Sequence, residues 1–255
     1  MQLRKITQYL FNNYPLEAAE IWDPSGFSVK FNLSEKITGI VVAIDLTTAV
    51  LNKALETNSN LILVHHPFKF MPTWNEEFLA APYKKSMLEI IKKHRINVLA
   101  FHTNYDNNVL GTSHQIGFRL GFNDHIDYHE TYPCVLNADL SINELTNRLK
   151  NNLKLFNFRT NVSDLNKKYK KIAILSGSGP AVLAHELNNK GIDLILVSDI
   201  KWNEWILYKE HNIDILELSH LDEQVFVSDI TQQLQQKFTA IKVTPIYISE
   251  PYKNI

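Results

Sequence analysis

The sequence has little of what several classes of protein require. Its one cysteine, Cys134, cannot form a disulfide within the chain, which favours a reducing compartment. A net charge of −1 provides no general basic field for binding a nucleic acid. No run approaches the ~18 apolar residues of a membrane-spanning helix, and residues 1–15 lack the continuous apolar core of a targeting peptide. We therefore expect a cytoplasmic protein without a membrane segment.

Hydrophobic residues make up 45% of the 255 residues, which is enough for a large core. Strand-like and helix-like segments alternate along the chain, as is typical of an α/β fold. The polar segment 123–133 divides them. We expect two α/β lobes with mixed sheets flanked by helices, residues 1–125 and 126–255, with the last strand free to return to the first lobe. Expected strands cover 37–44, 61–64, 96–101, 171–175, 193–197 and 214–218, and expected helices cover 46–57, 84–94, 115–122, 141–153, 181–190 and 203–211.

Two adjacent histidines, His65 and His66, follow the apolar run 61–64 and precede Pro67. Four consecutive aliphatic residues indicate a short buried strand, so both imidazoles emerge at its carboxyl end. Neighbouring residues on an extended segment point to opposite sides. The pair therefore favours two closely spaced metal ions over a single shared one.

Three more expected strands end in polar clusters. The strand 96–101 leads into His102, Thr103, Asn104, Tyr105 and Asp106, the strand 193–197 into Ser198 and Asp199, and the strand 214–218 into Ser219, His220, Asp222, Glu223 and Gln224. In open α/β sheets, ligands bind beyond the carboxyl ends of the strands. Histidine, aspartate and glutamate are the ligands expected for zinc, iron or manganese. We therefore expect these clusters to converge on one place at the carboxyl ends of the strands and to bind one or two divalent metal ions.

Other features favour structural roles. The segment Ser176-Gly177-Ser178-Gly179-Pro180 lacks the lysine of a phosphate-binding loop, so we interpret it as a turn from strand to helix. Cys134 heads a hydrophobic run and is expected to be buried. Trp202 and Trp205 are expected to pack against the core, and the segment 157–171 to form a solvated loop. The remaining histidines are expected at the surface, namely His94, His114, His125, His129, His185 and His211.

The order of these motifs resembles that of the Nif-three-like family, also called type 2 GTP cyclohydrolase I homologues. The resemblance spans residues 14–225 and rests on six segments: Trp22-Asp23-Pro24-Ser25-Gly26-Phe27, His65-His66-Pro67, His102-Thr103-Asn104-Tyr105-Asp106, Gly177-Ser178-Gly179, Ser198-Asp199 and Ser219-His220. It implies two α/β lobes, a dinuclear metal site between them and a homohexameric ring. It also implies that His65, His66, Asp106 and His220 are metal ligands, that Asp106 bridges the ions, and that His102 lies close by.

The chain departs from this family in its last motif. The family has a metal-binding glutamate four residues after the histidine, and this position is Gln224 here, with Glu223 one residue earlier. An amide keeps a carbonyl oxygen but loses the charge that a divalent cation prefers. Either Glu223 takes over as the ligand, or the second metal is held weakly.

Two classes of function fit these residues. As an enzyme, the protein would be a metal-dependent hydrolase acting on a nucleotide or a related small molecule, with His102 as a candidate proton shuttle. The resemblance implies GTP cyclohydrolase activity, although no segment of the sequence recognises guanine. The alternative is a metal-binding scaffold or interaction protein whose metals are structural. An open coordination position would favour the enzyme, and a closed ligand shell the scaffold.

Overall fold

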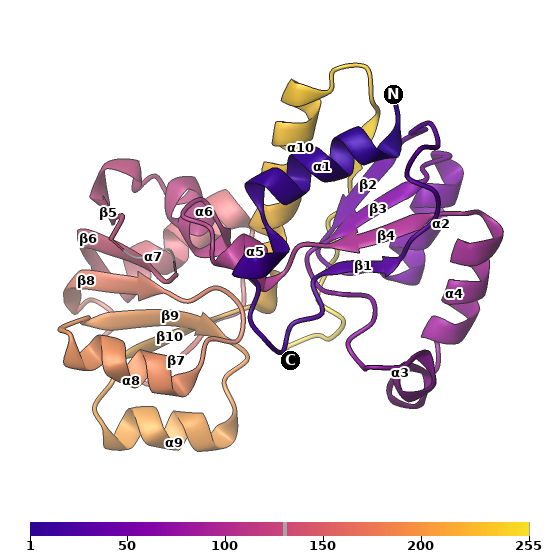
Figure 1. Cartoon of the computed structure of the whole chain (residues 1–255). Coiled ribbons are helices and arrows are strands. Elements are labelled where there is room, and N and C mark those ends of the chain that lie inside the picture. Colours follow the sequence, from indigo (N-terminus) through magenta and orange to yellow (C-terminus); the bar gives the residue numbers. More distant parts are fainter. Residues whose placement is uncertain (130–131, 255) are drawn as a thin grey trace. The chain divides into compact units, whose positions relative to one another are not determined.

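A computed structural model describes residues 1–129 and 132–254 (Figure 1). The described chain forms two compact units. Unit 1 comprises residues 1–108 and 226–248, and unit 2 comprises residues 109–225 with the carboxyl-terminal segment from Ser249. Each unit contains one mixed sheet flanked by helices, which confirms the predicted α/β class. The predicted boundary between the two lobes at residue 125 stays a prediction.

The sheet of unit 1 has the strand order β1 (Gly26–Val29), β4 (Asn97–Ala100), β3 (Leu61–Val64), β2 (Ile40–Ala43) and β11 (Val243–Pro245). β1 is antiparallel to β4, and the remaining neighbours are parallel. Every residue of β2, β3 and β4 is buried. Runs such as Leu-Ile-Leu-Val form these strands because a parallel sheet is covered on both faces.

Helices cover both faces of this sheet (Figure 1). One face packs against α1 (Leu3–Asn13) and α10 (Val225–Lys237), where Leu3, Ile6, Phe226 and Ile230 are fully buried. The other face packs against α2 (Thr48–Glu56) and α4 (Lys84–Lys93). The short helices α3 (Trp74–Ala80), α5 (Thr103–Asp106) and η1 (Leu16–Ala18) complete the unit.

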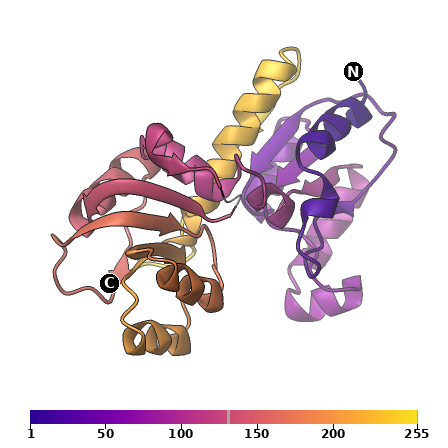
Figure 2. The ribbon, with the colours of Figure 1, turned by 60° about the vertical axis from the view of Figure 1, so that its left-hand side comes forward.

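The sheet of unit 2 has the order β5 (Ile126–Asp127), β6 (Cys134–Ser141), β8 (Lys168–Ile174), β9 (Leu194–Ser198), β10 (Ile215–Leu218) and β7 (Arg159–Thr160). The central strands β8, β9 and β10 are parallel. One face packs against α6 (Thr112–Arg119), α7 (Ile142–Arg148) and the π-turn η3 (Leu149–Leu153), and the other against α8 (Ala181–Asn189) and α9 (Trp202–Glu210), as Figure 2 shows.

Several local predictions are confirmed and others are wrong. The predicted helix at 141–153 is observed as α7 and η3 and begins with a capping box of Ser141 and Glu144. Cys134 is buried as predicted, and burial raises the pKa of its thiol to about 12. The segment 157–171 is not all loop, because Arg159 and Thr160 pair with β10 and β8 begins at Lys168. The segment 123–133 contributes η2 (Asn123–His125) and β5, while its residues 130 and 131 lie outside the described chain. Strands of two residues are too short to show an alternating pattern.

The predicted burial of two residues also needs correction. Trp202 is 81% exposed, so it does not pack against the core as predicted, whereas Trp205 does. His114, expected at the surface, is completely buried. His185 is half-buried against His211, with 4.5 Å between their ring centroids, while His94, His125 and His129 are exposed as predicted. Within the described residues, no helix is both long enough and apolar enough to cross a membrane.

Because His114 is buried, we expect the free energy of unfolding to fall in acid. Neither ring nitrogen has a hydrogen-bond partner within the described part of the chain, and burial lowers the pKa of His114 below its usual value of 6.5. On acidification the unfolded chain therefore takes up this proton before the folded chain does, so the free energy of unfolding falls as the pH drops below about 6.5. We expect His114→Gln to lose less stability than the unmodified protein between pH 7 and pH 5, measured by urea unfolding. Equal losses would contradict this role of His114.

Candidate metal centre

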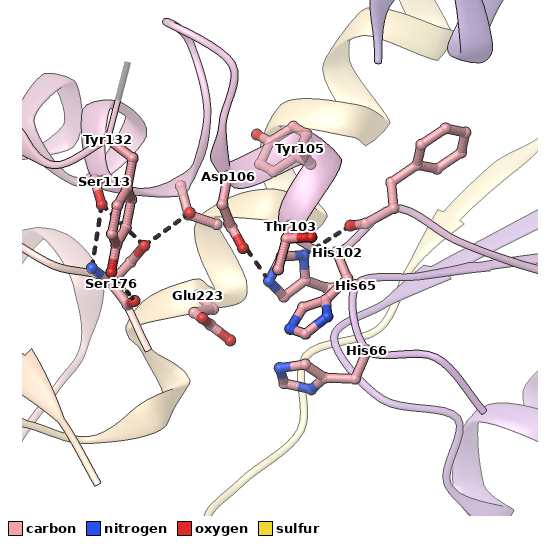
Figure 3. Close-up of polar contacts among 12 residues, drawn as sticks. His65, His66, His102, Thr103, Tyr105, Asp106, Ser113, Tyr132, Ser176 and Glu223 are labelled. Atoms are coloured by element: carbon pink, nitrogen blue, oxygen red, sulfur yellow. Dashed lines mark hydrogen bonds and ion pairs between the residues drawn. The ribbon is translucent and has the colours of Figure 1, made fainter. Parts of the chain in front are cut away.

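Three histidines of unit 1 converge beyond the carboxyl ends of β3 and β4. These strands are parallel neighbours, so His65 and His66 after β3 lie beside His102 after β4. The ring centroids of His65 and His66 are 5.0 Å apart, and those of His65 and His102 are 5.2 Å apart (Figure 3). One nitrogen from each ring lies within 4.8 Å of the others, so the three could hold a common metal ion.

The relation between His65 and His66 differs from the sequence-based expectation, which places their rings on opposite sides of a strand. Both residues instead lie in a bend after β3, where their backbone N–H groups donate to the Ile44 carbonyl group. The alternation of an extended strand does not apply to a bend, so the two rings can reach the same metal.

A hydrogen-bond acceptor holds the Nδ1 atom of each of these rings. Nδ1 of His65 lies 2.8 Å from the Phe101 carbonyl oxygen. Nδ1 of His66 lies 3.0 Å from Oδ1 of Asp45, and Nδ1 of His102 lies 3.0 Å from Oδ1 of Asp23. An Nδ1–H that donates to an acceptor leaves the lone pair on Nε2, which is the arrangement of metal-bound histidines. The donor set therefore fits zinc, iron or manganese.

Asp23 is a buried anchor for His102. Its carboxylate also accepts hydrogen bonds from the Ser25 hydroxyl at 2.6 Å and from the backbone and hydroxyl groups of Thr103 at 3.0 and 2.5 Å. Burial by itself raises the pKa of Asp23, but the hydrogen bonds from His102, Ser25 and Thr103 outweigh it and hold the pKa well below its usual range. In the sequence, Asp23 serves only to recognise the family, and nothing there indicates its contact with His102.

Asp106 brings a carboxylate to the same histidines. It ends α5, and its Oδ1 lies 3.7 Å from Nε2 of His65 (Figure 3). The preceding residue, Tyr105, is fully buried and donates its hydroxyl to Oδ2 of Asp229 at 2.7 Å, which ties α5 to α10. The predicted proximity of Asp106 and His102 to the histidine pair is therefore observed within unit 1. Its assignment as a bridging ligand stays a prediction.

Unit 2 carries a second cluster with the same pattern. Asp199 follows β9 and His220 follows the neighbouring parallel strand β10. Nδ1 of His220 lies 2.7 Å from Oδ2 of Asp199, and its Nε2 lies 2.9 Å from Oε2 of Glu223. Burial opposes protonation of His220, but the hydrogen bonds to Asp199 and Glu223 raise its pKa to about 12. His220 is thus a fourth imidazole whose Nδ1 faces an acceptor oxygen, and like that of His65 its Nε2 faces a carboxylate.

The geometry of η4 (His220–Gln224) explains why Glu223 contacts His220. This segment is a 3₁₀ helix, in which residues three positions apart lie on the same side. Glu223 is three positions after His220, whereas Gln224 is four positions after it. The sequence leaves open which of the two takes the role of the family's glutamate, and the helix type brings the carboxylate of Glu223 to the histidine.

Gly177 makes room for Glu223. Its φ of +67° suits glycine, and a Cβ atom at this position would overlap Oε1 of Glu223. The preceding residue, Ser176, is held by the Ser113 and Thr112 hydroxyl groups at 3.0 and 2.7 Å (Figure 3). The sequence predicts a plain turn over 176–180. In the structure this turn also accommodates the Glu223 carboxylate.

Asp222 is a buried acid to which the sequence assigns no role of its own beyond membership of the cluster after β10. It lies next to Glu223, and it accepts a hydrogen bond from the Ser198 hydroxyl at 3.2 Å. Burial and the neighbouring charge of Glu223 raise its pKa well above the usual value. A single buried aspartate after a histidine gives no distinctive signal in one sequence.

Comparison with known proteins identifies the family. Residues 1–254 match the family model described as Duf34/NIF3 (NGG1p interacting factor 3). The chain belongs to the Duf34/NIF3 family. This confirms the resemblance inferred from the order of the six motifs.

Two curated relatives of this NIF3-family chain are named GTP cyclohydrolase 1 type 2 homolog. The protein of Mycoplasmopsis pulmonis is 33% identical, with 98% of each chain covered. That of Ureaplasma parvum is 30% identical, with 92% of this chain and 90% of the relative covered.

Solved structures of the same fold include a hypothetical protein of Staphylococcus aureus (TM-score 0.85, 23% identity, covering 100% of this chain and 99% of that one). A Bacillus cereus protein related to NIF3 has a TM-score of 0.85 at 16% identity, with the same coverage. These likenesses support the fold.

Proposed function

We propose that the chain is a divalent-metal-dependent hydrolase acting on a nucleotide or a related small molecule. The observation that carries this proposal is the shared pattern of four histidines, His65, His66, His102 and His220, each with Nδ1 facing an acceptor oxygen. Histidines held in this way present the lone pair of Nε2, which suits them to bind a metal. The names of the relatives, GTP cyclohydrolase 1 type 2 homolog, favour a hydrolase.

We assign His65, His66 and Asp106 in unit 1, and His220 and Glu223 in unit 2, as the ligands of one or two zinc, iron or manganese ions. We predict from the sequence that both groups serve a single dinuclear centre. A divalent ion would lower the pKa of a water molecule and polarise a carbonyl or phosphoryl oxygen of the substrate.

His102 is the residue that we assign to proton transfer. Asp23 lies against Nδ1 of His102 and fixes the orientation of the ring, which a proton-transfer residue requires. One of its ring nitrogens is also close enough to His65 and His66 to make it a further ligand. The two roles differ in one measurable way, because a proton carrier can be removed without loss of metal.

The test starts with metal analysis of protein purified without chelators, followed by hydrolysis assays on nucleotides and phosphoesters with added zinc, iron(II) or manganese. We expect turnover that stops on chelation and returns with metal. His102→Gln should retain the metal and lose at least ~100-fold in turnover if it transfers protons. Loss of metal from this variant would make it a ligand, and bound metal without turnover on any substrate would favour the scaffold.

A homohexamer is proposed as the assembly, on the family resemblance alone. We expect light scattering to give about six times the 29.5 kDa mass of one chain. Measurements at several protein concentrations would separate a closed ring, whose mass is constant, from open association. A monomer at micromolar concentration would contradict the proposal.

A further inference from the structure

A cavity of about 450 Å³ lies within unit 2, beside the end of β10. Its wall is formed by the segment that leads into β7, the residues after β9 and β10, and the carboxyl-terminal segment. The size is in the range of small-molecule sites. Asp199 and Ser219 line it, and Asp199 is the residue that holds Nδ1 of His220. The cavity therefore adjoins a histidine of the candidate metal centre within one unit.

Aromatic rings dominate part of this cavity. Phe156, Phe158 and Tyr252 line it, and Phe156 and Tyr252 are 65% and 55% exposed. Large aromatic side chains that gather around a cavity and stay exposed offer flat surfaces for a ligand. Stacking on such surfaces accepts any planar ring, including nucleobases.

The polar groups of the cavity determine which kind of planar ligand ring it can bind. The Arg159 guanidinium group donates from Nε and, at 2.5 Å, from Nη2 to the Glu217 carboxylate, and it lies 5.7 Å from the Trp205 ring centroid. Two of its five N–H groups are used in this pair, which leaves three donors on an immobilised side chain. Asn157 and Asn254 add amide groups.

The carboxylates of the cavity already have partners within unit 2. Glu217 is buried and paired with Arg159, and Asp199 is paired with His220. With two acidic side chains and one arginine, the cavity has no surplus positive charge that would attract a triphosphate. The cavity therefore suits a neutral ring that accepts hydrogen bonds at its edge and carries any phosphate outside.

We propose that this cavity binds a flat heteroaromatic ring with hydrogen-bond acceptors on its edge, a nucleobase or a close analogue, stacked on Tyr252 and Phe156 and hydrogen-bonded to Arg159. This proposal names the substrate class for the proposed function. It rests on the proposed function only for the step in which the ring reaches the metal. Ring binding itself requires no metal.

The test is isothermal titration of guanosine, adenosine and cytidine into chelator-treated protein. We expect saturable binding of at least one nucleoside, and binding at least ~10-fold weaker in Tyr252→Ala and in Phe156→Ala. Both side chains are exposed, so their loss should leave the unfolding temperature unchanged. Tyr83→Ala, which removes a similarly exposed tyrosine of unit 1, is the matched control and should bind normally.

Absence of saturation with all three nucleosides at millimolar concentration, or unchanged affinity in both variants, would overturn the proposal. The outcomes separate it from the proposed function. Nucleoside binding without any metal-dependent turnover would leave the cavity assignment standing and remove the hydrolase. Turnover without nucleoside binding would remove only the cavity assignment.

Discussion

Replacement of both His65 and His66 by Ala is expected to reduce the bound metal to background. These residues provide two of the three imidazoles that converge in unit 1. In the double variant only His102 and Asp106 of this group remain, which is too few protein ligands to hold a divalent ion tightly. The measurement is the metal-to-protein ratio by mass spectrometry, after purification without chelators. Retention of stoichiometric metal would show that the centre lies elsewhere.

His65 is completely buried, so its loss could also disturb the fold. The double variant His65→Gln and His66→Gln keeps more of the side-chain volume and should lose metal equally, with a circular dichroism spectrum like that of the unmodified protein. The double variant His185→Ala and His211→Ala is a matched control, because it removes another contacting histidine pair. It should keep its metal.

Glu223→Ala is expected to weaken metal binding by at least ~10-fold, and Gln224→Glu to change it little. The reason is the 3₁₀ geometry of η4, which places the Glu223 carboxylate 2.9 Å from Nε2 of His220. A carboxylate that is already present beside the histidine makes a second one at position 224 superfluous. Titration calorimetry with zinc or manganese gives both affinities.

Glu223→Gln provides the closest control, since it preserves the shape of the side chain and removes only the charge. It should weaken binding nearly as much as Glu223→Ala, while Gln224→Ala should bind like the unmodified protein. If Gln224→Glu strengthens binding and the Glu223 variants bind normally, position 224 is the one that faces the metal, and our interpretation of η4 is wrong.

Sequence patterns predict the elements that carry the site because those elements have the strongest local signals. The runs 61–64 and 194–197 are aliphatic throughout and form β3 and β9 as expected. The residues that follow such strands emerge at the strand ends, so the sequence alone groups His65 and His66 with His102.

The groups that hold these histidines could not be predicted in the same way. Asp23 and Asp45 lie far from their histidines in sequence, and the Phe101 carbonyl oxygen could belong to any residue. The type of helix at η4 also depends on packing, because the same five residues fit an α-helical turn. Both features are set by tertiary contacts that leave no periodic pattern.

The order of segments in unit 1 has a consequence for synthesis on the ribosome. Residues 109–225 separate its two parts, and β11 pairs in parallel with β2 near the start of the chain. All strands of unit 2 therefore leave the ribosome before α10 and β11 exist. Until Phe226, Val227, Ile230 and Leu234 arrive, one face of the first sheet stays partly uncovered. We expect the nascent chain to need protection from aggregation for longer in unit 1 than in unit 2.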